Sequence, residues 1–183
     1  MQMDAGLDTG DMLQVQTVPV GDATTAQLHD TLAALGGELV VRALRDAERG
    51  KLQGTPQPRL PSGVSTGSLQ AQTLGISYAH KIEKHEAAID WTLPAEVIAR
   101  RVRAFNPFPG AASSLRGEVI KCWQALPLAS GTSLPHPPGT VLAADAAGVI
   151  IACGNGTALQ VTELQKAGGR RQPAQQFLQA MPL

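Results

Sequence analysis

The chain is 183 residues long, which suits one complete domain or one domain with part of another. Aromatic residues make up only 3% of it, so a hydrophobic core has to be built from Leu, Val, Ile and Ala. No stretch is long and apolar enough to span a bilayer, and the first residues lack the pattern of a secretory signal, so we expect a cytoplasmic protein without a membrane segment.

The formal net charge is zero, but the charges are unevenly distributed. Residues 1–74 contain 5 Lys and Arg against 8 Asp and Glu, whereas residues 75–183 contain 10 against 7. The basic second half permits a polyanionic partner. Cys122 and Cys153 lie in apolar runs and are expected to be reduced core thiols. The cysteines and the four scattered histidines lack the spacing of a metal site, so no metal is expected.

An acidic loop with two glycines occupies residues 3–12. Taken alone, its composition is typical of a plain turn, in which Asp side chains bond to the nearby backbone. A calcium loop is a second interpretation because Asp4, Asp8 and Asp11 are closely spaced, but no Glu follows at the distance that would complete such a site. A loop of this kind normally follows a buried strand, and almost no strand precedes it. We therefore expect the chain to begin inside an active site.

A strand and a helix are expected after this loop. Residues 15–20 alternate in polarity as a strand does. Thr24 and Gln27 have the spacing of a capping box, and residues 28–43 carry apolar side chains at steps of three and four, as one face of a helix does. Gly50 is expected to end that helix. Strand, acidic loop, strand and helix make up a fragment of an α/β layer that is too small to close a core alone.

A second unit is expected after a linker. Residues 54–74 are rich in Pro, Gly, Ser and Gln and have no period, which is typical of a linker. A helix is predicted over residues 94–105, and two prolines within residues 106–110 stop it. Short strand-like runs separated by glycine-containing turns follow at residues 119–123, 140–144, 149–153 and 159–164. This pattern favours a mainly β domain, a small barrel of the oligonucleotide-binding (OB) kind.

Four separated runs resemble the methionyl-tRNA formyltransferase family, in the order in which that family has them. The first is the acidic loop at residues 3–11, and the second is the run at 78–91, which is similar to the opening of the family's C-terminal domain. The most specific is Arg-Val-Arg-Ala-Phe-Asn-Pro-Phe-Pro-Gly-Ala at 101–111. The fourth lies at 164–178, where Leu-Gln-x-Ala-Gly-Gly-Arg-Arg is followed by Phe-Leu.

The resemblance implies three parts: residues 1–53 as the truncated end of a Rossmann-like α/β formyltransferase domain, 54–74 as a linker, and 75–183 as an OB-like tRNA-binding domain. It also implies transfer of a formyl group from 10-formyltetrahydrofolate to the methionyl amine of initiator tRNA. Asp8 matches the family's catalytic carboxylate. The residues that match the cofactor-binding side of the loop are Asp4, Ala5, Gly6 and Leu7.

Two segments that the family uses for catalysis do not occur in this sequence. One is an Asn-x-His pair, but Asn106 is followed two places on by Phe108, and Asn155 by Thr157. The other is a folate-holding Ser-Leu-Leu-Pro run. We therefore expect this chain alone to show no formyl transfer. We also expect residues 1–50 to be poorly stable, because nothing covers their apolar helix face.

The C-terminal domain is expected to bind initiator methionyl-tRNA as a monomer, mostly through phosphates. The basic residues predicted to bind tRNA are Lys81, Lys84, Arg100, Arg103, Arg170 and Arg171. For each of them, a solvated surface side chain is the alternative. Trp91, Phe105 and Phe108 could stack on bases, but core packing is expected because aromatic residues are so few.

The sequence leaves two functions open. In the first, the chain is a truncated formyltransferase. In the second, it is a non-catalytic RNA-binding module in which the barrel works alone and residues 1–53 are a vestige. Formylation of methionyl initiator tRNA by the purified chain, or RNA binding without formylation, discriminates between them.

Overall fold

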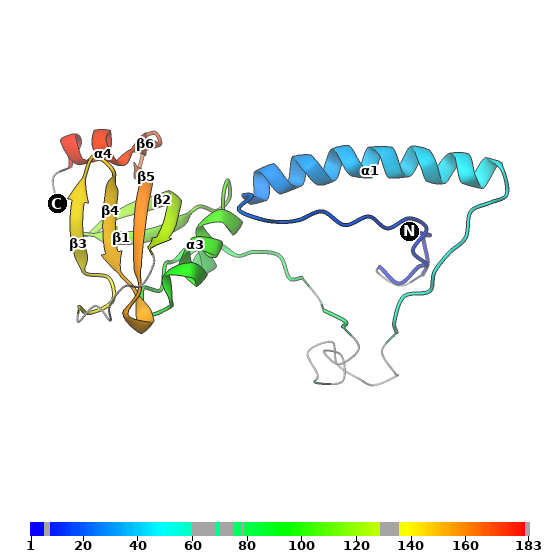
Figure 1. Cartoon of the computed structure of the whole chain (residues 1–183), viewed down its shortest axis with the longest axis horizontal. Coiled ribbons are helices and arrows are strands. Elements are labelled where there is room, and N and C mark those ends of the chain that lie inside the picture. Colours follow the sequence, from blue (N-terminus) through cyan, green and yellow to red (C-terminus); the bar gives the residue numbers. More distant parts are fainter. Residues whose placement is uncertain (6–7, 60–68, 70–74, 78, 129–135, 182–183) are drawn as a thin grey trace. The chain divides into compact units, whose positions relative to one another are not determined.

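The computed structural model describes residues 1–183 except for 6–7, 60–68, 70–74, 78, 129–135 and 182–183 (Figure 1). Most of the predicted linker therefore lies outside the described residues. The chain divides into two compact units, composed of Met1–Pro19 with Asp30–Ile82 and of Val20–His29 with Glu83–Leu183. In the described parts of both units, no helix combines the length and the apolar character needed to cross a membrane.

A short pairing between distant segments closes the N-terminal loop of the first unit. Met12 and Thr55 form an isolated antiparallel bridge, with N–H···O distances of 2.8 and 2.9 Å. The side-chain amide of Gln57 donates to the carbonyls of Asp8 and Gly10 at 3.0 and 2.6 Å. These bonds tie the acidic loop to the segment around residues 55–57.

The predicted strand at residues 15–20 is not formed. These residues have no regular secondary structure. A strand is stabilised by hydrogen bonds to a neighbouring strand, and no described segment pairs with residues 15–20 to supply them. Alternating polarity alone does not make a strand, so the α/β layer expected for residues 1–53 is present only as its helix.

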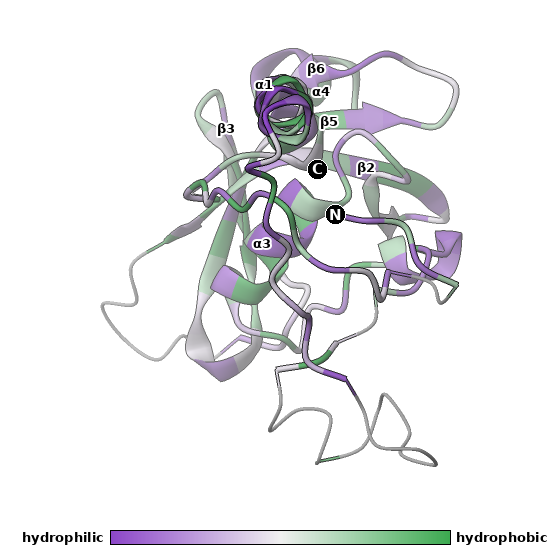
Figure 2. Cartoon of the chain, turned by 90° about the vertical axis from the view of Figure 1, so that its right-hand side faces the viewer, coloured by the Kyte–Doolittle hydropathy of each residue, from purple (hydrophilic) through white to green (hydrophobic). Residues whose placement is uncertain are grey.

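Helix α1 spans Thr25–Glu48 and begins and ends as the sequence predicts. The Thr24 N–H donates to Gln27 Oε1 at 2.9 Å, and the Gln27 N–H donates to Thr24 Oγ1 at 3.3 Å, which is a reciprocal capping box. Beyond the other end, Gly50 adopts a φ of +65°, the left-handed conformation that commonly follows a helix. No residue of α1 is buried, although polar and apolar residues both lie along it (Figure 2).

Helix α3 (Ala95–Ala104) is the main helix of the second unit, and it begins after Pro94 and ends before Asn106 as predicted. Its C-terminal carbonyls have no partner within the helix. The segment at the start of α1 supplies donors there: the Thr25 hydroxyl donates to Ala104 O at 2.6 Å, and the Ala26 N–H to Asn106 O at 3.2 Å.

A buried hydroxyl completes the opposite end of α3. Pro94 makes no side-chain cap, and the Ala95 N–H donates instead to the Thr157 hydroxyl at 2.8 Å. The same hydroxyl donates to Gly154 O at 2.7 Å. Thr157 therefore joins the first turn of the helix to the loop between two strands.

An antiparallel sheet of six strands forms the body of the second unit. The strands are β1 (Ala111–Leu115), β2 (Glu118–Leu128), β3 (Val141–Asp145), β4 (Gly148–Ala152), β5 (Ala158–Lys166) and β6 (Gln172–Pro173). Their order is β1-β2-β5-β4-β3, and β6 pairs with β5. Strands β2 to β5 confirm the four strand-like runs of the sequence.

The prediction of a mainly β domain is confirmed as a mixed helix and antiparallel-sheet domain, but closure into a barrel is not shown. Strands β1 and β3 stand at the two ends of the strand order, and no pairing among the described residues joins them. The sheet is therefore open over the residues that the structure describes. Strand β2 is irregular where it pairs with β5, with register shifts on both sides of Gln124.

The hydrophobic core belongs to the second unit, where α3 and the short helix α4 (Ala174–Ala180) pack with the sheet. Its largest fully buried side chains are Ile98, Val102, Leu159 and Val161. Phe177 of α4 is 2% exposed and joins the same cluster. Among the described residues, every buried hydrophobic side chain lies between Ala87 and Phe177, so α1 contributes none.

Candidate functional site

The two carboxylates predicted for the N-terminal site have different surroundings. The Asp4 carboxylate contacts its own loop, where it accepts a hydrogen bond from the Ala5 N–H at 2.8 Å. It also lies 3.5 Å from the Arg59 guanidinium. Asp8 is exposed and has a φ of +54°, a left-handed conformation that Asp adopts more readily than most residues. Gln57 holds the Asp8 carbonyl, not its carboxylate. The turn is thus fixed through the backbone.

The structure places Asp4, Ala5 and Asp8 around one hollow. The hollow has a volume of about 410 Å³ and is lined by Met1, Gln2, Met3, Asp4, Ala5, Asp8, Thr9 and Gly10. Gly6 and Leu7 lie outside the described residues. A hollow of this size can hold one ring system of a ligand, and its carboxylate oxygens can accept hydrogen bonds from N–H groups.

Two further features of the loop bear on its chemistry. Gly10 is buried, and a side chain there would collide with the carbonyl of Gln2, so the glycine is needed for the loop's own closure. Within the described residues, no three His, Cys, Asp or Glu side chains gather in a way that could hold a metal ion. The calcium-loop interpretation of Asp4, Asp8 and Asp11 therefore has no support from geometry.

The basic residues predicted to bind tRNA are spread over several elements. Lys81 is exposed in the first unit. Lys84 is exposed at the start of the short 3-10 helix η1 (Lys84–Ala87). Arg100 is exposed on α3, and Arg103 lies on the same helix with only 23% of its side chain exposed. A guanidinium nitrogen of Arg103 lies 3.5 Å from the Asp22 carboxylate, so its charge is already partly compensated.

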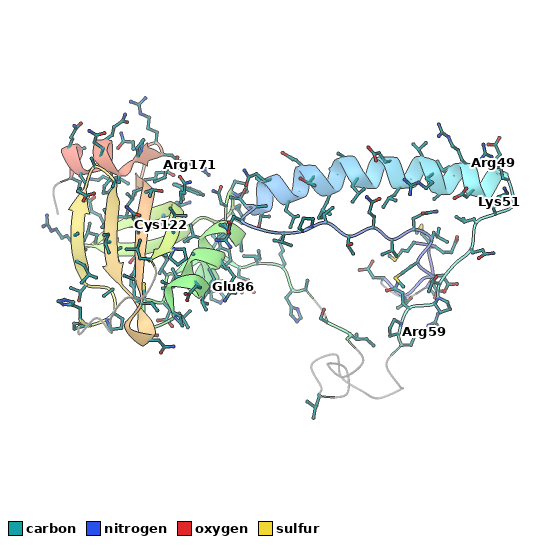
Figure 3. The ribbon with its side chains drawn as sticks, viewed as in Figure 1. Arg49, Lys51, Arg59, Glu86, Cys122 and Arg171 are labelled. Atoms are coloured by element: carbon teal, nitrogen blue, oxygen red, sulfur yellow. The ribbon has the colours of Figure 1, made fainter. Side chains whose placement is uncertain are left out.

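Arg170 and Arg171 follow β5 and are both exposed. Arg171, which Figure 3 labels, is one of them. Its guanidinium lies over the ring of Trp123, a residue of β2 that no sequence motif marked as functional. Lys121 approaches the same ring. Lys121 and Trp123 are two positions apart in one strand, a spacing that could have indicated a shared face. The approach of Arg171 depends on how β2 pairs with β5, which the sequence does not reveal.

The aromatic residues do not all pack as expected. Phe105 is buried, and Trp91 packs partly against the core while its Nε1–H donates to Ser113 Oγ at 3.0 Å. The prediction of core packing is wrong for Phe108, which is 61% exposed. Phe108 lies in the turn that follows α3, between two prolines, and that turn keeps its side chain outside the core.

The cysteines are confirmed as buried free thiols. Burial raises the pKa of Cys122 to about 12. Burial also raises the pKa of Cys153 to about 11, and a backbone hydrogen bond from Leu159 partly opposes that rise. Because the thiolate is the reactive form, these raised pKa values keep both side chains as thiols at neutral pH.

The fold is shared with solved structures of HypX from Aquifex aeolicus. The structure of HypX in complex with tetrahydrofolic acid has a TM-score of 0.62 and 24% sequence identity, over 96% of this chain and 28% of that one. A multiply substituted HypX variant gives a TM-score of 0.64 over 97% of this chain and 29% of that one, again at 24% identity. At this identity, the likeness shows the fold alone.

Sequence relatives identify the family. A family model described as formyl transferase, C-terminal domain, matches residues 81–182, which is more than half of the chain. The chain therefore belongs to the formyl transferase family. It is 54% identical over 185 residues to the methionyl-tRNA formyltransferase of Ralstonia nicotianae and 50% identical over 184 residues to that of Acidovorax ebreus. Each match covers 100% of this chain and 52% or 53% of the relative.

The predicted resemblance to methionyl-tRNA formyltransferases is thus confirmed along the whole chain. The chain spans about half the length of the curated relatives that it matches. A C-terminal fragment of such an enzyme fits both findings, since the matching family model is that of the C-terminal domain.

Proposed function

We propose that the chain is the C-terminal part of a methionyl-tRNA formyltransferase, which moves a formyl group from 10-formyltetrahydrofolate to the methionyl amine of initiator tRNA. The observation that carries this proposal is the 50–54% identity to enzymes of that name over the full chain. The match includes the acidic loop and α1 as well as the sheet. The proposed location is the cytoplasm, where translation begins, and the proposed state is a monomer.

The proposed reaction needs groups that assist an amine in attacking a formyl carbon. Negative charge grows on the formyl oxygen, and the attacking nitrogen must lose a proton, so a hydrogen-bond donor, an imidazole and a carboxylate all favour the transition state. We assign Asp8 to the carboxylate, which orients and stabilises the protonated imidazole or a bound water molecule. Its exposed position in a backbone-fixed turn supports this role. The donor and the imidazole would come from sequence that this chain does not contain.

The cofactor-side wall is proposed to be Asp4, Ala5, Gly6 and Leu7. 10-Formyltetrahydrofolate would supply the formyl group there. The hollow of about 410 Å³ fits one end of such a molecule in size, and the Asp4 and Asp8 carboxylates on its lining suit the N–H donors of a pterin ring. The tetrahydrofolic acid in the HypX structure adds support for a folate-derived donor.

We propose that residues 1–53 are the end of a Rossmann-like catalytic domain, residues 54–74 the linker, and residues 75–183 an OB-like tRNA-binding domain. Exposed apolar residues on α1 support the first assignment. Their exposed fractions lie between 46% and 65%, and they are Leu32, Val40, Val41 and Leu44. Apolar side chains on a helix are normally buried against a sheet or another helix, which the rest of an α/β domain would supply.

For the tRNA-binding domain, we propose contacts to the phosphate backbone. The candidates remain Lys81, Lys84, Arg100, Arg103, Arg170 and Arg171. The pairing of Arg103 with Asp22 makes it the weakest of them, because a phosphate would have to compete with a carboxylate already in place.

The test joins this chain to the N-terminal half of the Ralstonia nicotianae relative. The chimera should formylate methionyl initiator tRNA with 10-formyltetrahydrofolate, whereas the chain alone should bind that tRNA without formylating it. In the chimera, Asp8→Asn should lower kcat by about a hundredfold, in the range found for loss of acid–base assistance. Asp11→Asn is the matched control in the same loop and should leave kcat unchanged.

Two outcomes would contradict the proposal. Formylation by the chain alone would show that the missing segments are not needed for the chemistry. A folded chimera that binds tRNA and never formylates it would favour the non-catalytic RNA-binding module instead.

A further inference from the structure

A guanidinium lies on an indole ring at the surface of the second unit. The central carbon of the Arg171 guanidinium is 3.5 Å from the centroid of the Trp123 ring. That separation is the contact distance of a cation lying on the face of an aromatic ring. Trp123 is only 5% exposed, whereas Arg171 is exposed. The buried ring therefore supports the exposed guanidinium that lies on it.

The ring itself is held from two sides. Its Nε1–H donates to Gln165 Oε1 at 2.7 Å, and the Gln165 amide nitrogen donates to Gly169 O at 2.7 Å. Gln165 thus ties Trp123 to the turn that leads to Arg171. On another side, a Cβ at Gly110 would lie only 2.6 Å from the ring, so the backbone there is packed directly against it.

The charge around this ring is positive. The Lys121 ammonium is 5.3 Å from the ring centroid and donates to Pro109 O at 2.8 Å. Arg170 is exposed beside Arg171. Among the ion pairs between described residues, Lys166 pairs with Glu118 at 2.8 Å, and none engages Arg171 or Lys121. Two cations thus share one aromatic ring without an acidic partner in the described part of the chain.

We propose that Arg171 binds the phosphate backbone of RNA and that Trp123 and Gln165 are its positioning residues. Stacking occupies one face of the guanidinium and leaves its in-plane N–H groups available for a bidentate contact with phosphate. A side chain already fixed on a ring loses less conformational freedom on binding than a free one. This inference rests on the proposed function, because RNA is the partner that the function supplies.

The same geometry argues against base recognition at this ring. Trp123 is nearly fully buried, and Arg171 covers one face of the ring, so a nucleotide base has no free face on which to stack. Phosphate contacts carry no sequence information. Arg171 should therefore contribute equally to the binding of initiator and elongator tRNA.

Binding of the full chain to transcripts of the two tRNAs, measured over a range of salt concentrations, tests the role of Arg171. Arg171→Gln should weaken binding to both by about tenfold and lower the slope of log K against log salt by about one. Arg171→Lys keeps the charge without the planar fork and should give an intermediate affinity. Arg49→Gln makes the same charge change just beyond the end of α1 and serves as the matched control.

The role of Gln165 is tested separately, because substituting Trp123 would disturb the core. Gln165→Ala keeps every charge, yet it should weaken tRNA binding several-fold, and this effect should vanish when Arg171→Gln is already present. Near-equal thermal unfolding midpoints would verify the fold of each variant. In a Trp91→Phe background, Trp123 is the only tryptophan, so its fluorescence should change when tRNA binds.

Each failure has a distinct meaning. If the full chain binds neither tRNA, the proposed RNA partner itself is wrong. If it binds but Arg171→Gln leaves affinity and salt slope unchanged, the role of Arg171 is refuted while the proposed function stands. Additive effects of the Gln165 and Arg171 substitutions would refute positioning through Gln165. Displacement of tRNA by polyglutamate at equal charge concentration would indicate an acidic protein partner instead of phosphate.

Discussion

Thr157 shows how one side chain can supply the hydrogen-bond acceptor that the start of a helix lacks. The first N–H groups of any helix lack acceptors within it, and Pro94 provides no side-chain cap for α3. The buried Thr157 hydroxyl accepts the Ala95 N–H and donates to Gly154 O. Loss of this hydroxyl would leave the buried Ala95 N–H without a partner, while Gly154 O would keep the Thr157 N–H at 3.2 Å. An unpaired buried donor costs more free energy than its hydrogen bond contributes.

Thr157→Val should therefore lower the free energy of unfolding by about 1–3 kcal/mol, measured by urea denaturation. Thr162 offers a matched control, because its hydroxyl has no hydrogen-bond partner among the described residues although the atom is buried. Thr162→Val should be neutral or slightly stabilising. Equal destabilisation by both substitutions would show that packing, rather than hydrogen bonding, decides the effect at Thr157.

At the scale of elements, α1 stands out because none of its side chains is buried. It has 24 residues and none of them is buried, so its stability rests on its caps and on its own backbone bonds. Gly36 and Gly37 interrupt its middle, and nothing lies within 4 Å of a Cβ built at either position. The glycines are therefore not required by packing against any described residue.

Gly37→Ala should raise the stability of α1 by about 0.5–1 kcal/mol, because alanine loses less backbone freedom in a helix than glycine does. Amide hydrogen exchange within α1 should slow accordingly. Gly50→Ala should act in the opposite sense, since Gly50 has a φ of +65° beyond the end of the helix. Faster exchange in Gly37→Ala would mean that α1 is not an isolated helix in solution.

Local patterns predicted the elements whose signals lie within a few residues. The capping box at Thr24, the stop at Gly50 and strands β2 to β5 were all found in this way. Strand β1 was missed because Ala-Ala-Ser-Ser-Leu has little apolar alternation, and α4 because seven residues are too few to show a period. The strand at residues 15–20 was wrongly predicted because a strand depends on a neighbour.

At the scale of the whole molecule, the two units differ in how they are stabilised. Every buried hydrophobic side chain among the described residues belongs to the second unit, while α1 exposes apolar residues to solvent. Segments with few buried contacts open at low free-energy cost. Local opening should therefore be frequent in the first unit and rare in the sheet.

Limited trypsin digestion followed by mass spectrometry tests this difference. The first cuts should fall after Arg42 and Arg45 of α1 and after Arg49 just beyond it, which are all exposed. Cleavage after Lys121, a half-buried residue of β2, should be slow because the strand pairs on both sides. Early loss of the sheet with survival of α1 would contradict the assignment of the core to the second unit.

The candidate sites were predictable to different degrees. The acidic loop could be found from Asp4, Asp8 and their glycines, because a loop is a local feature and its resemblance to a family is carried by adjacent residues. The surroundings of Arg171 could not be found in this way. Trp123, Gln165 and Arg171 meet only through the pairing of β2 with β5, and Gln165 gives no chemical signal in the sequence.

The contacts at and just before the start of α1 join residues on the two sides of the linker, so they bear on what a cut in the backbone there would do. The Thr25 hydroxyl and the Ala26 N–H bond to the end of α3, and Asp22 pairs with Arg103. A cut between residues 48 and 83 would separate the partners of these bonds onto two polypeptides without breaking any of the bonds. They are therefore the contacts that two separately expressed pieces would have to form again on reassembly.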